Sequence, residues 1–130
     1  MALMFLTGDA MSGGPLHHHI SAAALLGERR TAPRYRLYSI RDEYPALRPV
    51  SEGGQPILGE LYDVPMDQLW DLLADEPPEL ELSMVELDDR VAGEQSAARL
   101  SFGMVLRRGE GGGYPDITHH GGWLAYRTAR

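Results

Sequence analysis

The sequence predicts an α+β fold in which one mixed sheet is covered by one or two helices. About six segments have the alternating or continuous apolar pattern of strands, and one segment has the period of an amphipathic helix. The chain has 130 residues, of which 43% are hydrophobic, and this size is typical of one compact domain with one core. We therefore expect a single domain over residues 1–130, built as a small mixed barrel or a curled sheet.

The first half of the chain contains three predicted strands. Residues 2–6 are a continuous apolar run that ends at a glycine turn, and residues 34–40 and 57–64 are rich in strand formers. Between the first two, residues 16–26 have apolar positions at helical spacing, which favours a short helix or an irregular turn. Residues 41–56 hold three prolines and two glycines, so we expect mostly loop with a short strand near Val50.

The second half begins with the clearest helix pattern, residues 65–75. Pro65 suits the first helical position, and the apolar residues predict a broad face toward the core, made of Met66, Leu69, Trp70, Leu72 and Leu73. Residues 79–87 alternate acidic and apolar side chains, which predicts a strand with its acidic face toward solvent. We expect a further strand at 101–106, a hairpin tip at 109–113 and a compact tail at 116–126.

The composition excludes several classes of function. The formal net charge is −7 and the pI about 5.1, whereas a nucleic-acid binder needs a concentrated basic surface. Without cysteine there is no disulfide, thiolate zinc site or cysteine nucleophile, and without lysine there is no Schiff base. No run approaches the ~20 apolar residues of a membrane span. A cytoplasmic protein that needs no cofactor is therefore the expectation.

Four blocks of sequence are more specific than any periodicity. In chain order they are Ser12-Gly-Gly-Pro-Leu-His-His-His19, Thr31-Ala-Pro-Arg-Tyr-Arg-Leu-Tyr38, the stretch from Pro77-Pro to Val85-Glu-Leu87, and Asp116-Ile-Thr followed by Gly121-Gly-Trp123. Together they resemble the C-terminal domain of allophanate hydrolases, in the same order and across nearly the whole chain. The second and fourth blocks are specific when they occur together.

The resemblance implies a fold and an activity. The fold would be γ-glutamylcyclotransferase-like, a small mixed β-barrel with flanking helices and a cavity beside the loop after the first strand. In the larger hydrolases an amidase domain cleaves allophanate, and the C-terminal domain is proposed to assist loss of carbon dioxide from the N-carboxycarbamate product. This chain has no lysine and no room for the Ser-Ser-Lys machinery of that amidase class. It therefore resembles a stand-alone relative of the C-terminal domain.

The same resemblance indicates candidate site residues. A substrate-binding loop would comprise Thr7, Gly8, Asp9, Ala10, Met11 and Ser12, at the place where cyclotransferases hold a substrate oxygen with backbone amides. Asp9 departs from the cyclotransferase pattern, and a tight turn that merely closes a strand is the alternative reading. Glu76 has the spacing of the cyclotransferase acid/base, although Leu73 and Pro77 differ from that pattern and a solvated carboxylate is the alternative.

His18 matches a histidine that recurs in the Pro-Leu-Asn-His string of the family, so it is a candidate for proton transfer. The alternative is a histidine in a polar surface turn. Tyr35 is a candidate substrate contact, or otherwise a core residue. The five histidines fall in two clusters without ligand spacing, so we expect no metal.

Three functions follow from these residues. The first is binding of a small carboxylate or carbamate metabolite and its decarboxylation, with His18 as acid/base. The second is a γ-glutamylcyclotransferase that forms 5-oxoproline with Glu76. The third is a non-catalytic module that docks on an amidase partner.

Overall fold

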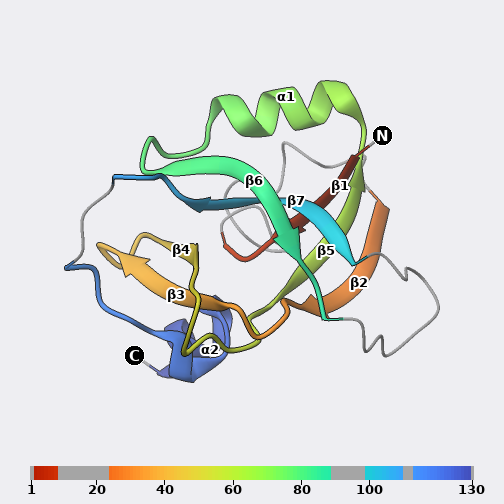
Figure 1. Ribbon diagram of the computed structural model, residues 1–130. Coiled ribbons are helices and arrows are strands. Elements are labelled where there is room, and N and C mark those ends of the chain that lie inside the picture. Colours follow the sequence, from red (N-terminus) through yellow and green to blue (C-terminus); the bar gives the residue numbers. More distant parts are fainter. Residues whose placement is uncertain (1, 9–23, 89–98, 110–112, 130) are drawn as a thin grey trace.

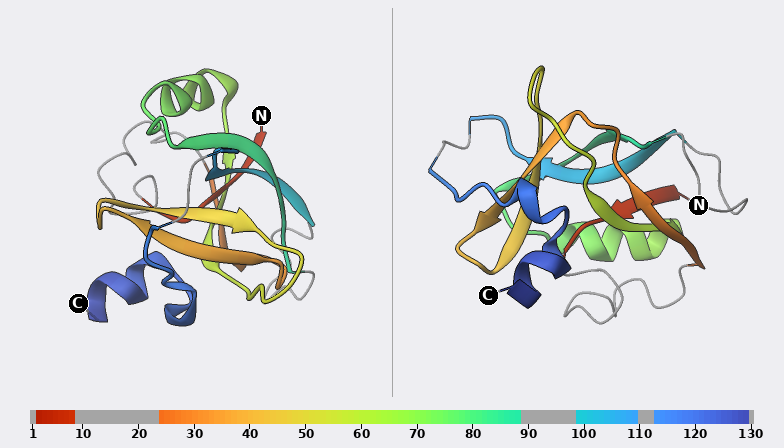
Figure 2. Two further views of the ribbon diagram at one scale, coloured as in Figure 1. Left: turned by 60° about the vertical axis from the view of Figure 1, so that its left-hand side comes forward. Right: turned by 90° about the horizontal axis from the view of Figure 1, so that it is seen from below.

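The computed structural model describes residues 2–8, 24–88, 99–109 and 113–129. Within them the chain forms one mixed sheet whose strands are β1 (Ala2–Leu6), β2 (Ala24–Arg30), β3 (Tyr35–Ile40), β4 (Tyr44–Pro49), β5 (Leu58–Val64), β6 (Leu80–Glu86) and β7 (Leu100–Leu106). The helices are α1 (Met66–Ala74), the short 3-10 helix η2 (Thr118–His120) and α2 (Trp123–Ala129). Figures 1 and 2 show α1 and α2 at opposite ends of the molecule. The α+β prediction is confirmed.

The sheet is organised around β7. The strand order is β2-β5-β1-β7-β4-β3, and β6 pairs with β7 in addition. β1 and β4 run parallel to β7, whereas the other pairs are antiparallel. The segments after β2 and β6 meet at one isolated bridge, Thr31↔Leu87, and no ladder extends from it in the described residues. A closed barrel is therefore not confirmed.

The core lies between these strands and α1. The apolar run of β1 is buried except for Leu3, and it packs with Leu37, Leu61 and Leu72. This burial explains why β1 is a continuous apolar run: β5 and β7 flank it, and both of its faces are covered.

The helix α1 agrees with the predicted boundaries, but its buried face is narrower than expected. Leu69 and Leu72 are buried, whereas Met66 is 62% exposed and Trp70 is 75% exposed. At 100° per residue, Leu69, Leu72 and Leu73 share one side of the helix, and Met66 and Trp70 lie on its flank. The broad apolar face predicted from the sequence was wrong at these two positions.

The largest correction concerns residues 41–56, where β4 stands in a segment predicted to be mostly loop. Val50 donates its amide hydrogen to the carbonyl of Arg34 at 2.9 Å, which fixes the hydrogen-bonding phase of the β3–β4 ladder. In this phase Pro45 and Pro49 occupy positions that do not bond to β3, so their nitrogens point away from that strand. The prolines therefore remove no hydrogen bond of the β3–β4 ladder.

Two smaller corrections involve the ends of the chain. Residues 24–26, which fell in the predicted helix or turn of 16–26, begin β2 because Leu25 pairs with Tyr62 in β5. The rest of that segment lies outside the described residues. The tail is compact, as expected, and it contains the unpredicted helix α2. None of the helices in the described ranges is long and apolar enough to cross a membrane.

Candidate active site

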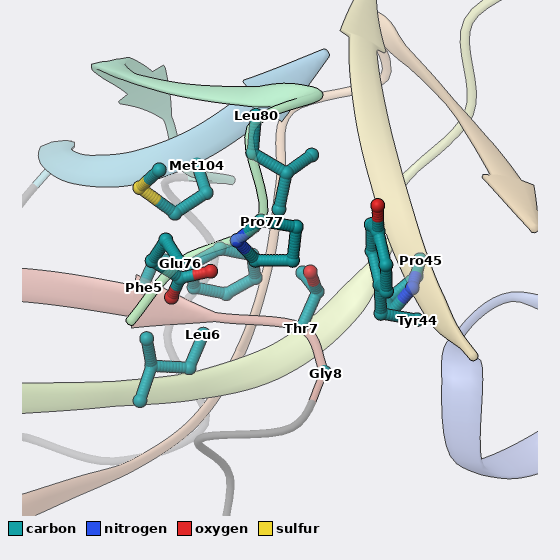
Figure 3. A pocket seen from close by; sticks show the side chains of 10 residues that line it. All are labelled: Phe5, Leu6, Thr7, Gly8, Tyr44, Pro45, Glu76, Pro77, Leu80 and Met104. Carbon is teal, nitrogen blue, oxygen red and sulfur yellow. The ribbon is translucent and has the colours of Figure 1, made fainter. Parts of the chain in front are cut away.

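A small cavity of about 30 Å³ lies beside the end of β1. The residues that line it come from β1, the turn after β1, β4, the end of α1, β6 and β7; they are Phe5, Leu6, Thr7, Gly8, Tyr44, Pro45, Glu76, Pro77, Leu80 and Met104. Figure 3 shows the Glu76 carboxylate, the Thr7 side chain and the Tyr44 ring around the same space. A volume of this size holds one or two water molecules or one small polar group.

The turn after β1 reaches the cavity because residue 8 is a glycine. A Cβ atom at Gly8 would lie 2.6 Å from Cδ and 2.9 Å from Cγ of Pro45. The proline ring of β4 therefore packs directly on the Gly8 backbone, and any larger residue would push the two segments apart. This contact fixes the backbone of residues 7–8 against β4.

Glu76 enters the cavity because α1 ends just before it. The amide of Asp75 donates to the carbonyl of Leu72 at 3.2 Å, and the amide of Glu76 donates to the carbonyl of Leu73 at 3.3 Å. Pro77 follows and cannot continue the helical hydrogen bonding. The chain turns at this point, and the partly buried Glu76 stands over Phe5 and Leu6.

Tyr44, on the other side of the cavity, is held by a charged network. Its hydroxyl donates to a carboxylate oxygen of Glu79 and accepts from the Arg41 guanidinium at 3.2 Å, while Arg41 also donates to Glu79 at 2.8 Å. Hydrogen bonds from Tyr44 and Arg41 lower the pKa of Glu79 to about 2. Burial and the bond to Glu79 raise the pKa of Tyr44 above its usual value. The aromatic wall of the cavity is therefore neutral and fixed in orientation.

This network makes a testable contribution to acid stability. Because the folded pKa of Glu79 lies below its ordinary value of 4.5, the stabilisation is present above about pH 4.5 and is lost as the pH falls toward 2. We expect the free energy of unfolding to drop through this window in the wild type and to drop less in Glu79→Gln. Urea unfolding at a series of pH values measures this free energy. The control is Glu52→Gln, because Glu52 is an exposed carboxylate in a loop. Parallel wild-type and Glu79→Gln curves would contradict the assignment.

The structure brings together three of the residues predicted for the site. Thr7, Gly8 and Glu76 line one cavity although Glu76 is remote in sequence. Tyr35 is not among the lining residues: it is buried in β3, and its hydroxyl accepts a hydrogen bond from the Glu86 amide at 2.9 Å. The remaining predicted residues lie outside the described ranges, namely Asp9, Ala10, Met11, Ser12 and His18.

Sequence reasoning missed Tyr44, Pro45, Leu80 and Met104 as lining residues. Tyr44 and Pro45 belong to the segment predicted to be mostly loop, and their contact with Gly8 depends on how β4 lies across the sheet. The expectation of a loop over residues 41–56 gave no sign that the Tyr44 ring would form part of the cavity wall.

Two of the distinctive sequence blocks have structural roles. The Thr31 hydroxyl accepts a hydrogen bond from the Ile57 amide at 2.9 Å, and Thr31 is fully buried. The Thr118 hydroxyl accepts from the Leu37 amide at 2.8 Å, and Asp116 accepts from the Thr118 amide at 2.9 Å. Burial alone would raise the pKa of Asp116, but hydrogen bonds from Arg36 and Thr118 lower it. These blocks therefore tie the loops to the sheet.

A second cavity, of about 160 Å³, lies between the β2–β5 pair and the start of α2. Its lining includes charged side chains, such as Arg30 and Glu60. It also includes His120 and the Gly121-Gly-Trp123 block. No group of three potential metal ligands is present among the described residues. The two cavities have no lining residue in common.

The sequence model of the allophanate hydrolase C-terminal domain family matches residues 2–128. This chain belongs to that family. The resemblance seen in the four sequence blocks is thus confirmed, and the match covers both the cavity beside β1 and the loops tied by Thr31 and Thr118.

Two curated relatives extend the comparison. The chain is 29% identical over 130 residues to a urea amidolyase of Lachancea kluyveri, covering 93% of this chain but only 7% of that protein. It is 35% identical over 86 residues to a putative γ-glutamylcyclotransferase of Vibrio cholerae, covering 65% of this chain and 71% of that protein. The family domain is therefore similar both to part of a large enzyme and to a small protein.

Solved structures agree with this placement. A uropathogenic E. coli-specific protein superposes with a TM-score of 0.85 at 27% identity, covering 99% of this chain and 97% of that one. Allophanate hydrolase of Kluyveromyces lactis superposes with a TM-score of 0.80 at 28% identity, covering 98% of this chain and 21% of the hydrolase. The family domain thus corresponds to about a fifth of the length of that hydrolase chain.

Proposed function

We propose that the cavity beside β1 binds a small carboxylate or carbamate metabolite and promotes its decarboxylation. The observation that carries this proposal is the meeting of Thr7, Gly8 and Glu76 at a cavity of about 30 Å³. A space of that size suits one carboxyl or carbamate group rather than a long substrate chain. Membership of the allophanate hydrolase C-terminal domain family supports the same class of ligand.

The chemistry requires one proton transfer. When carbon dioxide leaves an N-carboxyl group, the bond between nitrogen and carbon breaks, the electron pair stays on nitrogen, and nitrogen takes a proton. His18 and Glu76 are the acid/base candidates for that proton, and water restores it. Glu76 lines the cavity, so its carboxyl group is placed to exchange this proton with the ligand.

The direct test follows carbon dioxide and ammonia release from N-carboxycarbamate generated in place by a separate amidase. We expect the wild type to accelerate release over buffer and His18→Ala to lose most of that acceleration. His119→Ala, a substitution at an exposed residue of η2, is the matched control and should behave as wild type. Release by the wild type no faster than in buffer would exclude this reaction.

A γ-glutamylcyclotransferase is the second candidate, and a specific observation favours it. Glu76, which resembles the acid/base of those enzymes in its spacing, does line the cavity with the turn after β1. The similarity to the putative γ-glutamylcyclotransferase of Vibrio cholerae supports this reading. The test is formation of 5-oxoproline from γ-glutamyl peptides. Absence of that product would exclude γ-glutamylcyclotransferase activity.

Docking on an amidase partner is the third candidate. It is supported by the comparison in length, because the domain corresponds to 21% of an allophanate hydrolase chain and 7% of a urea amidolyase. Co-purification with an amidase, together with no turnover in both enzyme assays, would favour this role over catalysis.

A further inference from the structure

Strand β6 presents an edge of the sheet whose hydrogen-bonding phase can be assigned. It pairs with β7 along its whole length, from Leu80↔Leu106 to Glu86↔Leu100. Arg107 donates its amide to the carbonyl of Glu79 at 2.7 Å, and the amide of Leu87 donates to the carbonyl of Arg99 at 2.7 Å. In an antiparallel ladder these bonds mean that odd-numbered residues of β6 bond to β7. The backbone groups of its even-numbered residues point away from β7.

At both ends of β6 these outward groups are satisfied within the chain. The Leu80 amide donates to the carbonyl of Pro77 at 3.1 Å, and its carbonyl accepts from Arg107 at 3.0 Å. The Glu86 amide donates to the Tyr35 hydroxyl at 2.9 Å, and its carbonyl accepts from the Ala32 amide at 3.0 Å. Among the described residues, the outward groups without such a partner are therefore those in the middle of the edge.

The middle is Leu82 and Met84. Across the part of the chain that the structure describes, the outward amide and carbonyl of these two residues have no hydrogen-bond partner. Unpaired groups in a row on an edge strand are a template for pairing with another strand. The edge offers two donors and two acceptors, with bonded residues closing it at both ends.

The side chains around this edge are apolar and exposed. Leu82 is 40% exposed and Met84 is 51% exposed, and on β7 Phe102 is 37% and Leu100 is 55% exposed. Met84 is paired with Phe102, and Glu86 with Leu100, so these apolar residues share one face of the β6–β7 pair. The sequence predicted the acidic residues of β6 as its solvent face, and Leu82 and Met84 are therefore exposed against expectation. A contiguous patch of this kind marks an interaction surface.

We propose that β6 pairs with β6 of a second copy of this chain, antiparallel, about a two-fold axis at Ser83. In that register Leu82 of each copy stands opposite Met84 of the other, and both pairs can form two hydrogen bonds. All the unpaired outward groups of both strands are then satisfied at once. The apolar side chains of Leu82 and Met84 meet across the axis, with Phe102 beside them.

The charges of β6 fit this register. Glu81 stands opposite Val85 and Glu86 opposite Leu80, so no acidic residue directly faces another. A longer foreign strand fits less well, because bonds to Pro77 and Arg107 close one end of the edge and bonds to Tyr35 and Ala32 close the other. The formal net charge of −7 per chain opposes association, so added salt should strengthen the dimer.

Sedimentation equilibrium over a range of concentrations tests the proposal. We expect a reversible dimer in the wild type and a dissociation constant raised roughly 100-fold in Met84→Lys, because each copy then places an ammonium opposite Leu82 of the other, beside the axis. Leu124→Lys is the matched control, since Leu124 is 57% exposed on α2, and it should leave dimerisation unchanged. A wild type that stays monomeric at every concentration, or Met84→Lys with an unchanged dimer, overturns the proposal.

A second measurement separates backbone pairing from side-chain contact. Met84→Pro removes one outward amide but no bond to β7, so it should weaken the dimer while circular dichroism stays that of the wild type. In the wild type, hydrogen exchange of the Leu82 and Met84 amides should slow as concentration rises. The Ser83 amide, which bonds to β7, should show no such dependence. Exchange at Leu82 and Met84 that is independent of concentration overturns the proposal even if both variants fail to fold.

Discussion

Glu76→Gln is expected to lower turnover by roughly 100-fold or more, whichever of the two proposed reactions the protein catalyses. Glutamine keeps the size and polarity of the side chain but can neither accept nor release a proton at neutral pH. Glu76 is the acid/base candidate that the structure places in the cavity, which Thr7 and Gly8 also line. Loss of the proton-transfer group should reduce kcat and leave the fold intact.

The control for this prediction is the neighbouring residue. Asp75 is an exposed carboxylate that ends α1 and does not line the cavity, so Asp75→Asn should keep the wild-type rate. Steady-state rates and thermal unfolding should be measured on both variants. Equal kcat in wild type and Glu76→Gln would remove Glu76 as the proton-transfer group in both reactions and leave His18 as the remaining acid/base candidate.

Gly59→Ala is expected to lower the free energy of unfolding by about 3 kcal/mol. A Cβ atom at Gly59 would lie 2.4 Å from the carbonyl oxygen of Leu6 and 2.6 Å from Cζ of Phe5. Neither atom can move away easily, because Leu6 is held in the β1–β5 ladder and Phe5 is 2% exposed in the core. The same two residues line the cavity beside β1, so ligand binding should weaken as well.

Gly122→Ala is the matched control for Gly59→Ala. A Cβ atom at Gly122 would meet Leu58 at an ordinary distance of 3.4 Å, and Gly122 is buried like Gly59. Gly122→Ala should therefore change stability by less than about 1 kcal/mol. Denaturant unfolding of both variants gives the two values. If both variants lose a similar free energy of unfolding, close packing at Gly59 is not the cause of the loss in Gly59→Ala.

Most strands could be predicted because their patterns are local. β1 is a continuous apolar run and β5 a run of strand formers, and both lie within a residue of their predicted positions. β4 could not be predicted, because Pro45 and Pro49 indicate a loop unless their nitrogens point away from the hydrogen-bonded neighbour. That phase is set by pairing with β3, which the local sequence does not contain.

Some residues of the candidate site could be predicted from the sequence and others could not. Thr7, Gly8 and Glu76 were found through motif spacing, and the structure places them around one cavity. Tyr44 and the packing of Pro45 on Gly8 could not be found, because contacts between β4 and the turn after β1 depend on the order of strands in the sheet. Tyr35 was a reasonable candidate by residue type, yet its hydroxyl bonds to the Glu86 amide in the core.

By itself the sequence determined the fold class, the family and the position of most strands, since these depend on periodicity and on short motifs. The tertiary structure alone decided which residues surround the cavity and which face of each element is covered. Leu82 and Met84 of β6 illustrate the reason, because an alternating pattern separates two faces of a strand without saying what packs on either one. In this fold Val85, on the acidic face, is fully buried against Gly103, while Leu82 and Met84 on the apolar face reach solvent.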